Sequence, residues 1–158
     1  MSDKQKAYDE LLPQVAALIQ GETDEVSILA NVSAVLKERF GWLWVGFYMD
    51  RGGELRLGPF QGPVACMHIA YDRGVCGAAF SQRKAIVVPD VELFPGHIAC
   101  SSLSRSEIVV PILTPRGPLG VLDIDSTELS TFDDTDRQNL ERLCALLAEV
   151  IREVRGKR

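Results

Sequence analysis

The sequence predicts an α+β fold in which a central antiparallel sheet is flanked by terminal helices packed on one face. Three observations predict it. Apolar residues recur at helical spacing near both ends of the chain, short runs in the middle alternate apolar and polar residues, and tight turns join several of these runs directly. Strands joined by hairpins form antiparallel sheets, and helices at the chain ends then gather on one face of the sheet.

Two helices are expected at the N-terminus. The first covers residues 7–20, whose helically spaced apolar side chains are Tyr8, Leu11, Leu12, Val15, Leu18 and Ile19. Thr23 or Asp24 is suited to cap the second helix. Its expected buried stripe consists of Val26, Leu29, Val32, Val35, Leu36 and Phe40. Gly41 should end this helix, because glycine adopts the left-handed conformation that follows many helix C-termini.

The pattern changes to strands after the second helix. Residues 42–49 are aromatic and β-branched, the turn residues 50–53 follow, and residues 54–60 alternate, which is typical of a β-hairpin. Residues 64–69 are expected to form a further short strand. Three strands should therefore follow one another in sequence.

A short helix, a strand and a long loop come next. Residues 75–82 are small and apolar enough for a short helix, and residues 85–88 form a strand that Pro89 ends. Residues 90–106 lack any period and are expected to be a long ordered loop. Loops of that length inside a compact domain are usually functional.

A second hairpin and a last helix complete the expected fold. Residues 107–113 and 119–126 are predicted to be strands on either side of a five-residue turn. Asp133 or Thr135 should begin the last helix. Its apolar face consists of Leu140, Leu143, Leu147, Val150, Ile151 and Val154.

Length and composition narrow the class of protein. A chain of 158 residues argues for one domain, over residues 1–158, and 46% hydrophobic with 25% charged residues excludes a disordered or fibrous protein. The net charge of −5, from 17 basic and 22 acidic residues, argues against a nucleic-acid partner. No apolar run reaches the roughly 18 residues of a membrane helix. The charged N-terminus also lacks the apolar segment of a signal peptide, so a cytoplasmic protein with cysteines as thiols is expected.

Three carboxylates should meet on the second hairpin. If Leu113 pairs with Leu119, the numbers of paired residues sum to 232, and Glu107 lies opposite Asp125. Side chains two residues apart share a face of a strand, so Asp123 joins the same acidic patch. Directly opposed like charges destabilise a sheet. The patch is either a solvated strand face or a functional cluster that binds a cation such as an ammonium group, or keeps a proton as a general acid.

The four cysteines are not spaced like a zinc site. Cys66, Cys76 and Cys100 are separated by 9 and 23 residues, without the close cysteine pairs of such sites, and the chain has only two histidines. No metal site is therefore expected. Cys144 lies within the apolar stripe of the last helix, where a cysteine is usually a small buried side chain.

The remaining three cysteines differ in their expected reactivity. Cys76 should lie at the start of the short helix, where the helix dipole lowers the pKa of a thiol, although a small residue for close packing explains it equally well. Cys66 lies in a strand pattern, so core packing is its alternative. Cys100 lies in the long loop near the acidic patch and has little packing reason to be there. Cys100 is thus the foremost candidate for a reactive thiol.

Several segments resemble the free methionine-(R)-sulfoxide reductases, which are single-domain proteins of the GAF fold. The resemblance covers nearly the whole chain, in order and spacing. It rests on Gly62-Pro-Val-Ala-Cys66, Gly74-Val-Cys-Gly77, Phe94-Pro-Gly-His-Ile-Ala-Cys100, Ser106-Glu-Ile-Val109 and Gly120-Val-Leu-Asp-Ile-Asp-Ser126. Three cysteines together with the acidic trio make it specific, since most GAF domains are ligand sensors.

The resemblance implies a catalytic role for the cysteines. By similarity Cys100 is the nucleophile and Cys66 is the principal resolving cysteine, with Cys76 as an alternative. Free methionine sulfoxide would be the substrate, and thioredoxin would reduce the resulting disulfide without any bound cofactor. Nothing in composition or spacing distinguishes the R from the S sulfoxide, so the stereochemistry is implied only by the resemblance.

The resemblance also implies the residues that bind the substrate. The acidic residues that hold the substrate and protonate its oxygen would be Glu107, Asp123 and Asp125, and the pocket aromatics would be Trp44 and Tyr48. Core packing is the alternative for the two aromatics. The sheet and terminal helices are compatible with a homodimer. The competing functions are a GAF sensor for a small ligand and a thiol redox switch, and the acidic trio argues against the switch.

Overall fold

The computed structural model describes residues 2–98 and 100–157, and within them the strands form one antiparallel sheet of order β3-β2-β1-β6-β5-β4. The strands are β1 (Trp44–Asp50), β2 (Leu55–Gln61), β3 (His68–Ile69), β4 (Ile86–Val88), β5 (Ser106–Thr114) and β6 (Gly117–Ser126). The helices are α1 (Asp3–Ile19), α2 (Glu25–Phe40), α3 (Gly74–Gln82), α4 (Asp134–Gly156) and the 3-10 turn η1 (Val91–Leu93).

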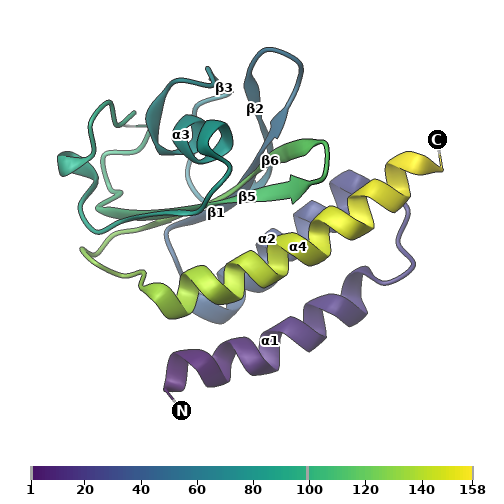
Figure 1. Cartoon of the computed structure of the whole chain (residues 1–158). Helices are drawn as coiled ribbons and strands as arrows, with labels where there is room; N and C mark the ends of the chain where they lie inside the picture. Colours follow the sequence, from purple (N-terminus) through teal and green to yellow (C-terminus); the bar gives the residue numbers. More distant parts are fainter. Residues whose placement is uncertain (1, 99, 158) are drawn as a thin grey trace.

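The helices are distributed unequally over the two faces of the sheet. Figure 1 shows α2 and α4 side by side on one face, with α1 beyond them, and α3 on the opposite face. The terminal helices thus lie on one side of the sheet, as expected, and the α+β class is confirmed. Among the described helices, the short α3 covers the opposite face, where it contacts β5 and β6.

Each face of the sheet has its own apolar cluster. On β5, Ile108, Val110 and Ile112 join the large cluster beneath α2 and α4, whereas Val109 belongs to the smaller cluster beneath α3. The alternation follows from the pleat, which turns successive side chains to opposite faces. Glu107 shares the face of Val109, so the strand directs this carboxyl toward α3.

The helix ends largely follow the predicted signals. Ser2 caps α1, which therefore begins four residues before the predicted start, and the Asp24 side chain accepts a hydrogen bond from Ser27 N at 2.9 Å to cap α2. Gly41 ends α2 with φ of 68°. Val26 was predicted to be buried, but 61% of it is exposed, because it lies on the outer side of the first turn of α2, whereas Glu25 and Ile28 are buried.

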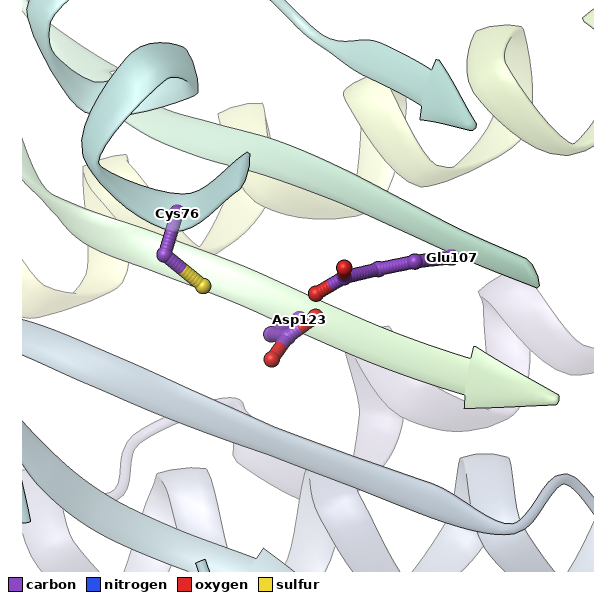
Figure 2. Close-up of side chains that lie close together, drawn as sticks. All are labelled: Cys76, Glu107 and Asp123. Atoms are coloured by element: carbon purple, nitrogen blue, oxygen red, sulfur yellow. The ribbon is translucent and has the colours of Figure 1, made fainter. Parts of the chain in front are cut away.

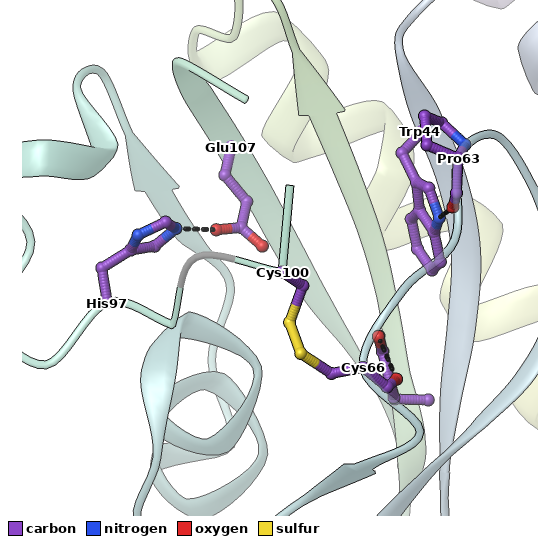
Figure 3. The surroundings of a disulfide bond; sticks show 7 residues. Trp44, Pro63, Cys66, His97, Cys100 and Glu107 are labelled. Atoms are coloured by element: carbon purple, nitrogen blue, oxygen red, sulfur yellow. Dashed lines mark hydrogen bonds and ion pairs between the residues drawn. A yellow bond between two sulfur atoms is a disulfide. The ribbon is translucent and has the colours of Figure 1, made fainter. Parts of the chain in front are cut away.

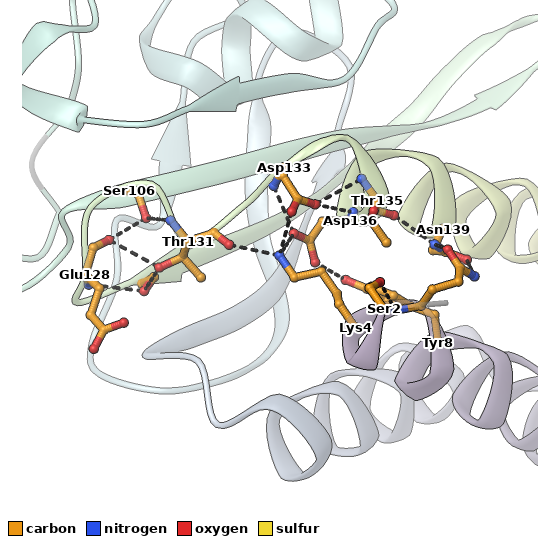
Figure 4. Close-up of polar contacts among 12 residues, drawn as sticks. Ser2, Lys4, Tyr8, Ser106, Glu128, Thr131, Asp133, Thr135, Asp136 and Asn139 are labelled. Atoms are coloured by element: carbon orange, nitrogen blue, oxygen red, sulfur yellow. Dashed lines mark hydrogen bonds and ion pairs between the residues drawn. The ribbon is translucent and has the colours of Figure 1, made fainter.

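A buried carboxylate fastens α1 to α4 (Figure 4). Asp136 is 1% exposed, and its oxygens accept hydrogen bonds from Tyr8 Oη at 2.6 Å, Lys4 Nζ at 2.7 Å and Asp133 N at 2.9 Å. Two of these donors lie on α1, and the third belongs to the N-cap of α4. Because every bond is made to one buried carboxylate, Asp136 fixes the packing of the two helices.

One predicted strand is shorter in the structure, and the predicted long loop contains a short 3-10 turn. Of the predicted strand 64–69, only His68–Ile69 forms a strand that pairs with β2. Residues 64–67 belong to the loop that precedes it. The loop 90–106 is ordered in its described part and contains η1. Backbone bonds from Arg105 N to Ser126 O at 2.8 Å and from Val91 N to Arg105 O at 2.9 Å anchor its ends.

No helix among the described residues combines the length and apolar character needed to span a membrane.

Candidate active site

The register of the β5–β6 hairpin brings the three predicted carboxylates together. Glu107 pairs with Asp125 and Val109 with Asp123, which is the predicted register at the site. The prediction was wrong near the turn, where Leu113 pairs with Pro118 rather than Leu119. A register shift between residues 111 and 113 absorbs the difference, so the acidic trio keeps its common face.

Burial dominates the electrostatics of the trio. Glu107 is 5% and Asp123 is 6% exposed, so the solvated-face alternative is excluded. Burial, followed by repulsion from Asp123 and Asp125, raises the pKa of Glu107 well above its usual range. Burial likewise raises the pKa of Asp125 well above its usual range, although a hydrogen bond from Ser104 Oγ at 2.9 Å opposes the shift.

Asp123 is the member of the trio that ionises most readily. Burial raises its pKa too, but hydrogen bonding to Glu107 and to Cys76 and the charge of His97 all lower it again. These shifts favour the protonated forms of Glu107 and Asp125, while Asp123 accepts hydrogen bonds. A buried carboxylic acid that stays protonated at neutral pH is a proton donor.

Cys76 lies on the first turn of α3, and Figure 2 shows its thiol close to the carboxyl groups of Glu107 and Asp123. The helix packs closely against the loop before it, since a Cβ atom at Gly77 would lie 2.8 Å from the carbonyl oxygens of Ala70 and Tyr71. The expectation of a lowered thiol pKa was wrong. Burial, and then the charges of Asp123 and Glu107, raise the pKa of Cys76 well above its usual range and outweigh the helix dipole.

Cys66 and Cys100 are joined by a disulfide, with their Cα atoms 5.5 Å apart (Figure 3). Cys66 lies in the loop before β3 and not in a strand as predicted, so core packing does not account for it. Cys100 lies in the long loop, next to Ala99, which is outside the described residues. The pair thus connects the two loops that border the acidic trio.

Trp44 and Tyr48 lie on the same face of β1, because an even number of positions separates them, and both line the same pocket. Their rings stack with centroids 5.8 Å apart, and both are buried. Tyr48 Oη donates a hydrogen bond to Cys66 O at 2.8 Å, and Trp44 Nε1 donates one to Pro63 O at 3.0 Å. The two aromatics therefore form a wall of the pocket and also hold the loop that carries Cys66.

Seven of the eight predicted site residues line one cavity of about 50 Å³. The eighth, Cys66, is bonded to the lining residue Cys100. The described residues that form the cavity beyond the predicted set include His97, Ile98, Ser104 and Val75. The cavity lies between the sheet and α3, because residues of β1, β5, β6 and α3 line it together with loop residues.

Sequence reasoning missed the position of His97. Its Nε2 lies 3.8 Å from Glu107 Oε1, and burial lowers the pKa of its imidazole. The signal was its place three residues before Cys100 in the long loop, but no pattern showed which strand that loop crosses. His97 brings a polar nitrogen to the edge of the trio.

Cys144 is separate from this site. It is buried among the apolar residues beneath α4, and its thiol lies 3.9 Å from Val110 O on the opposite face of the sheet. Burial raises its pKa. As predicted, it is a packing residue, and it offers a matched control for the cysteines of the pocket.

The site can also hold a cation, which the cysteine spacing did not indicate. Ligand atoms of Cys76, Glu107 and Asp123 all lie within 4.8 Å of one another. They come from α3, β5 and β6, so no short sequence motif contains them.

Comparison with known proteins agrees with this geometry. The GAF domain family matches residues 22–152. The chain is 45% identical over 150 residues to the free methionine-R-sulfoxide reductase of Escherichia coli, covering 94% of this chain and 91% of that protein. It is 41% identical over 154 residues to the free methionine-R-sulfoxide reductase of Saccharomyces cerevisiae, covering 92% and 86% of the two chains.

A solved structure shows the same similarity across the whole fold. The free methionine-R-sulfoxide reductase of Neisseria meningitidis, in complex with its substrate, superposes with a TM-score of 0.97 at 50% identity. The match covers 100% of this chain and 96% of that one. Sequence and fold together show that the chain belongs to the GAF domain family and, within it, to the free methionine-R-sulfoxide reductases.

Proposed function

We propose that this protein reduces free methionine (R)-S-oxide to methionine, with Cys100 as the nucleophile. The observation that carries the proposal is that one pocket contains both a cysteine pair and a group of buried acids. A disulfide between Cys66 and Cys100 borders a buried carboxyl cluster that retains protons. Reduction of a sulfoxide needs both a thiol that accepts oxygen and an acid that protonates it. The relatives from Escherichia coli and yeast carry this activity in their names.

The first step transfers oxygen from the substrate to the protein. The Cys100 thiolate attacks the sulfoxide sulfur while Glu107 donates a proton to the sulfoxide oxygen. The sulfur–oxygen bond of the substrate breaks, methionine leaves with two more electrons, and Cys100 becomes a sulfenic acid. The raised pKa of Glu107 supports its role as the donor.

The second step restores the thiols. Cys66 condenses with the Cys100 sulfenic acid to release water and form the disulfide, and an external dithiol then reduces it by exchange. Thioredoxin is the proposed dithiol. Cys76 remains the alternative resolving cysteine, although its hydrogen bonding to Asp123 favours a place in the carboxyl cluster. Methionine sulfoxide and a dithiol thus yield methionine, a disulfide and water.

The acidic cluster is proposed to recognise the α-ammonium of a free amino acid. Oδ1 of Asp123 is buried without a hydrogen-bond partner in the described part of the chain, so it can accept one from the substrate. Asp125 lies two residues along the same face. Trp44 and Tyr48 would pack against the side chain of the substrate. A methionine within a peptide lacks the ammonium and would leave Asp123 unpaired.

Three further assignments belong to the same proposal. The scheme needs no resident cofactor, because the electrons come from the external dithiol. The compartment is the cytoplasm, where thiols are kept reduced. A homodimer is compatible with the exposed surfaces of the terminal helices, and one domain is proposed to span residues 1–158.

A single-turnover experiment tests the proposed chemistry. Fully reduced protein, freed of dithiol, is mixed with excess methionine (R)-S-oxide. One methionine per chain should form, with loss of two thiols and appearance of the Cys66–Cys100 disulfide in a peptide map. A Cys144→Ser variant should behave identically, because Cys144 is outside the pocket. Thiols that persist unchanged in the presence of the substrate would contradict the proposal.

A further inference from the structure

We propose that the base of the pocket binds a thiophilic divalent cation, Zn²⁺ foremost, through Cys76 and the carboxylates of Glu107 and Asp123. This cation is an inhibitor or regulator of the site and takes no part in the reduction. The spacing of the cysteines predicted no metal site, but it could not show one whose ligands come from a helix and two strands.

The geometry requires little movement. The three ligand atoms lie within 4.8 Å of one another and point toward a common centre, as Figure 2 shows. Bonds of about 2.3 Å to sulfur and about 2.0 Å to oxygen place tetrahedral zinc ligands roughly 3.3–3.6 Å apart. Small side-chain rotations would therefore close the cluster on an ion, without displacement of α3, β5 or β6.

An independent observation also points to a ligand. Among the buried polar side-chain atoms of residues 2–98 and 100–157, Oδ1 of Asp123 is the one without a hydrogen-bond partner. Asp123 is only 6% exposed, so bulk water does not compensate. Leaving such an acceptor unpaired is costly, and a cation coordinated at this oxygen would remove the cost.

The cluster supplies three of the four ligands of a tetrahedral site, as in zinc sites that keep an open fourth position. His97 lies at its edge, with Nε2 3.8 Å from Glu107 Oε1. One sulfur and two oxygen donors suit Zn²⁺ and Co²⁺. Mg²⁺ and Ca²⁺ prefer oxygen ligands alone, so the site should discriminate against them.

The site remains available when the enzyme is oxidised. Cys76 is a free thiol while Cys66 and Cys100 are joined, so the cation does not compete with the disulfide. On binding, the ion displaces the thiol proton of Cys76 and the proton of Glu107 to solvent. Competition with the substrate ammonium follows only if the proposed function is right, since both cations would occupy Asp123.

Equilibrium dialysis of the disulfide form against Zn²⁺, without substrate or dithiol, tests the site. Wild-type protein and a Cys144→Ser variant should each bind one Zn²⁺ per chain. Cys76→Ser should bind at least about 100-fold more weakly, because even the loss of an outer partner of a metal ligand costs 10–100-fold. Equal binding by wild type and Cys76→Ser, or no saturable binding by wild type, would overturn the proposal.

Co²⁺ gives a second measurement that does not depend on one variant's folding. Wild-type protein should show the thiolate-to-cobalt absorption band and intense tetrahedral bands, and Glu107→Gln should weaken binding without removing the band. A cobalt spectrum that lacks a thiolate band would contradict the site. Zinc binding that methionine sulfoxide fails to displace would instead count against the proposed substrate and leave the metal site intact.

Discussion

Glu107 and Asp125 lie directly opposite each other on β5 and β6, so a single cross-strand pair consists of two carboxyl groups. Like charges in such a pair destabilise a sheet. Burial raises the pKa of both groups well above the usual range, so the pair persists by keeping protons. The pair lowers the stability of the sheet but provides a buried acid with a raised pKa, and such perturbed groups are typical of catalytic sites.

The first prediction concerns proton donation. Glu107→Gln should lower kcat for methionine sulfoxide by about 10²–10⁴, because an amide has the shape of the acid but cannot donate its proton. Steady-state kinetics with excess dithiol measure the effect. Glu141→Gln, which changes a largely exposed carboxylate on α4, is the matched control and should leave kcat unchanged. A Glu107→Gln enzyme with wild-type kcat would remove Glu107 from the chemistry.

The same substitution should stabilise the protein as the pH rises. The unfolded state releases the Glu107 proton near the usual pKa of 4.5, whereas the folded state keeps it to higher pH. The stability of wild type relative to Glu107→Gln is therefore greatest below pH 4.5. Above that value it falls by up to about 1.4 kcal/mol per pH unit, until the folded pKa is passed.

Urea unfolding of both proteins at about pH 5 and about pH 8 measures this difference. The stability of Glu107→Gln relative to wild type should be higher at the higher pH. A difference that is constant with pH would mean that Glu107 ionises alike in the folded and unfolded states.

The two candidate resolving cysteines should behave differently. In Cys66→Ser, one turnover should still yield methionine, but the Cys100 sulfenic acid should accumulate and react with dimedone. In Cys76→Ser, the Cys66–Cys100 disulfide should form as in wild type, because these two sulfurs are already bonded without Cys76. Mass spectrometry of the trapped adduct distinguishes them. A dimedone adduct that forms in Cys76→Ser but not in Cys66→Ser would instead identify Cys76 as the resolving cysteine.

Asp136 should carry much of the stability of the terminal helices. Asp136→Ala leaves Tyr8 and Lys4 without their acceptor and should lower the free energy of unfolding by about 3 kcal/mol. Asp134→Ala changes an exposed carboxylate on the same helical turn and should cost less than about 1 kcal/mol. Thermal or urea unfolding of the two variants gives the comparison, and equal losses would show that the buried contacts of Asp136 contribute little.

Periodicity and capping residues were sufficient to predict most of the fold. The stripe of α4, the cap at Asp24 and the stop at Gly41 are local signals, and the structure follows them. The pairing of Glu107 with Asp125 was also predictable. The predicted pairing at the turn was wrong, but a register shift beyond residue 111 confines that error to the turn. Local pattern thus determined the elements and the face of the trio.

The remaining features of the site depend on tertiary structure. No local pattern shows that α3 buries Cys76 against Asp123, which reverses the expected direction of its pKa shift. The place of His97 beside Glu107 depends on the path of an aperiodic loop across the sheet. The cation cluster combines residues from three elements, so only the packed fold reveals it.

The most direct test of the proposed function is the fate of racemic free methionine sulfoxide. Purified protein is incubated with both diastereomers and a dithiol, and the remaining sulfoxides are separated by chromatography. The R form should disappear and methionine should appear, while Cys100→Ser should leave both diastereomers untouched and Cys144→Ser should match wild type. If wild-type protein consumes neither diastereomer, the reductase assignment is contradicted and a sensor for a small ligand becomes the better account of the pocket.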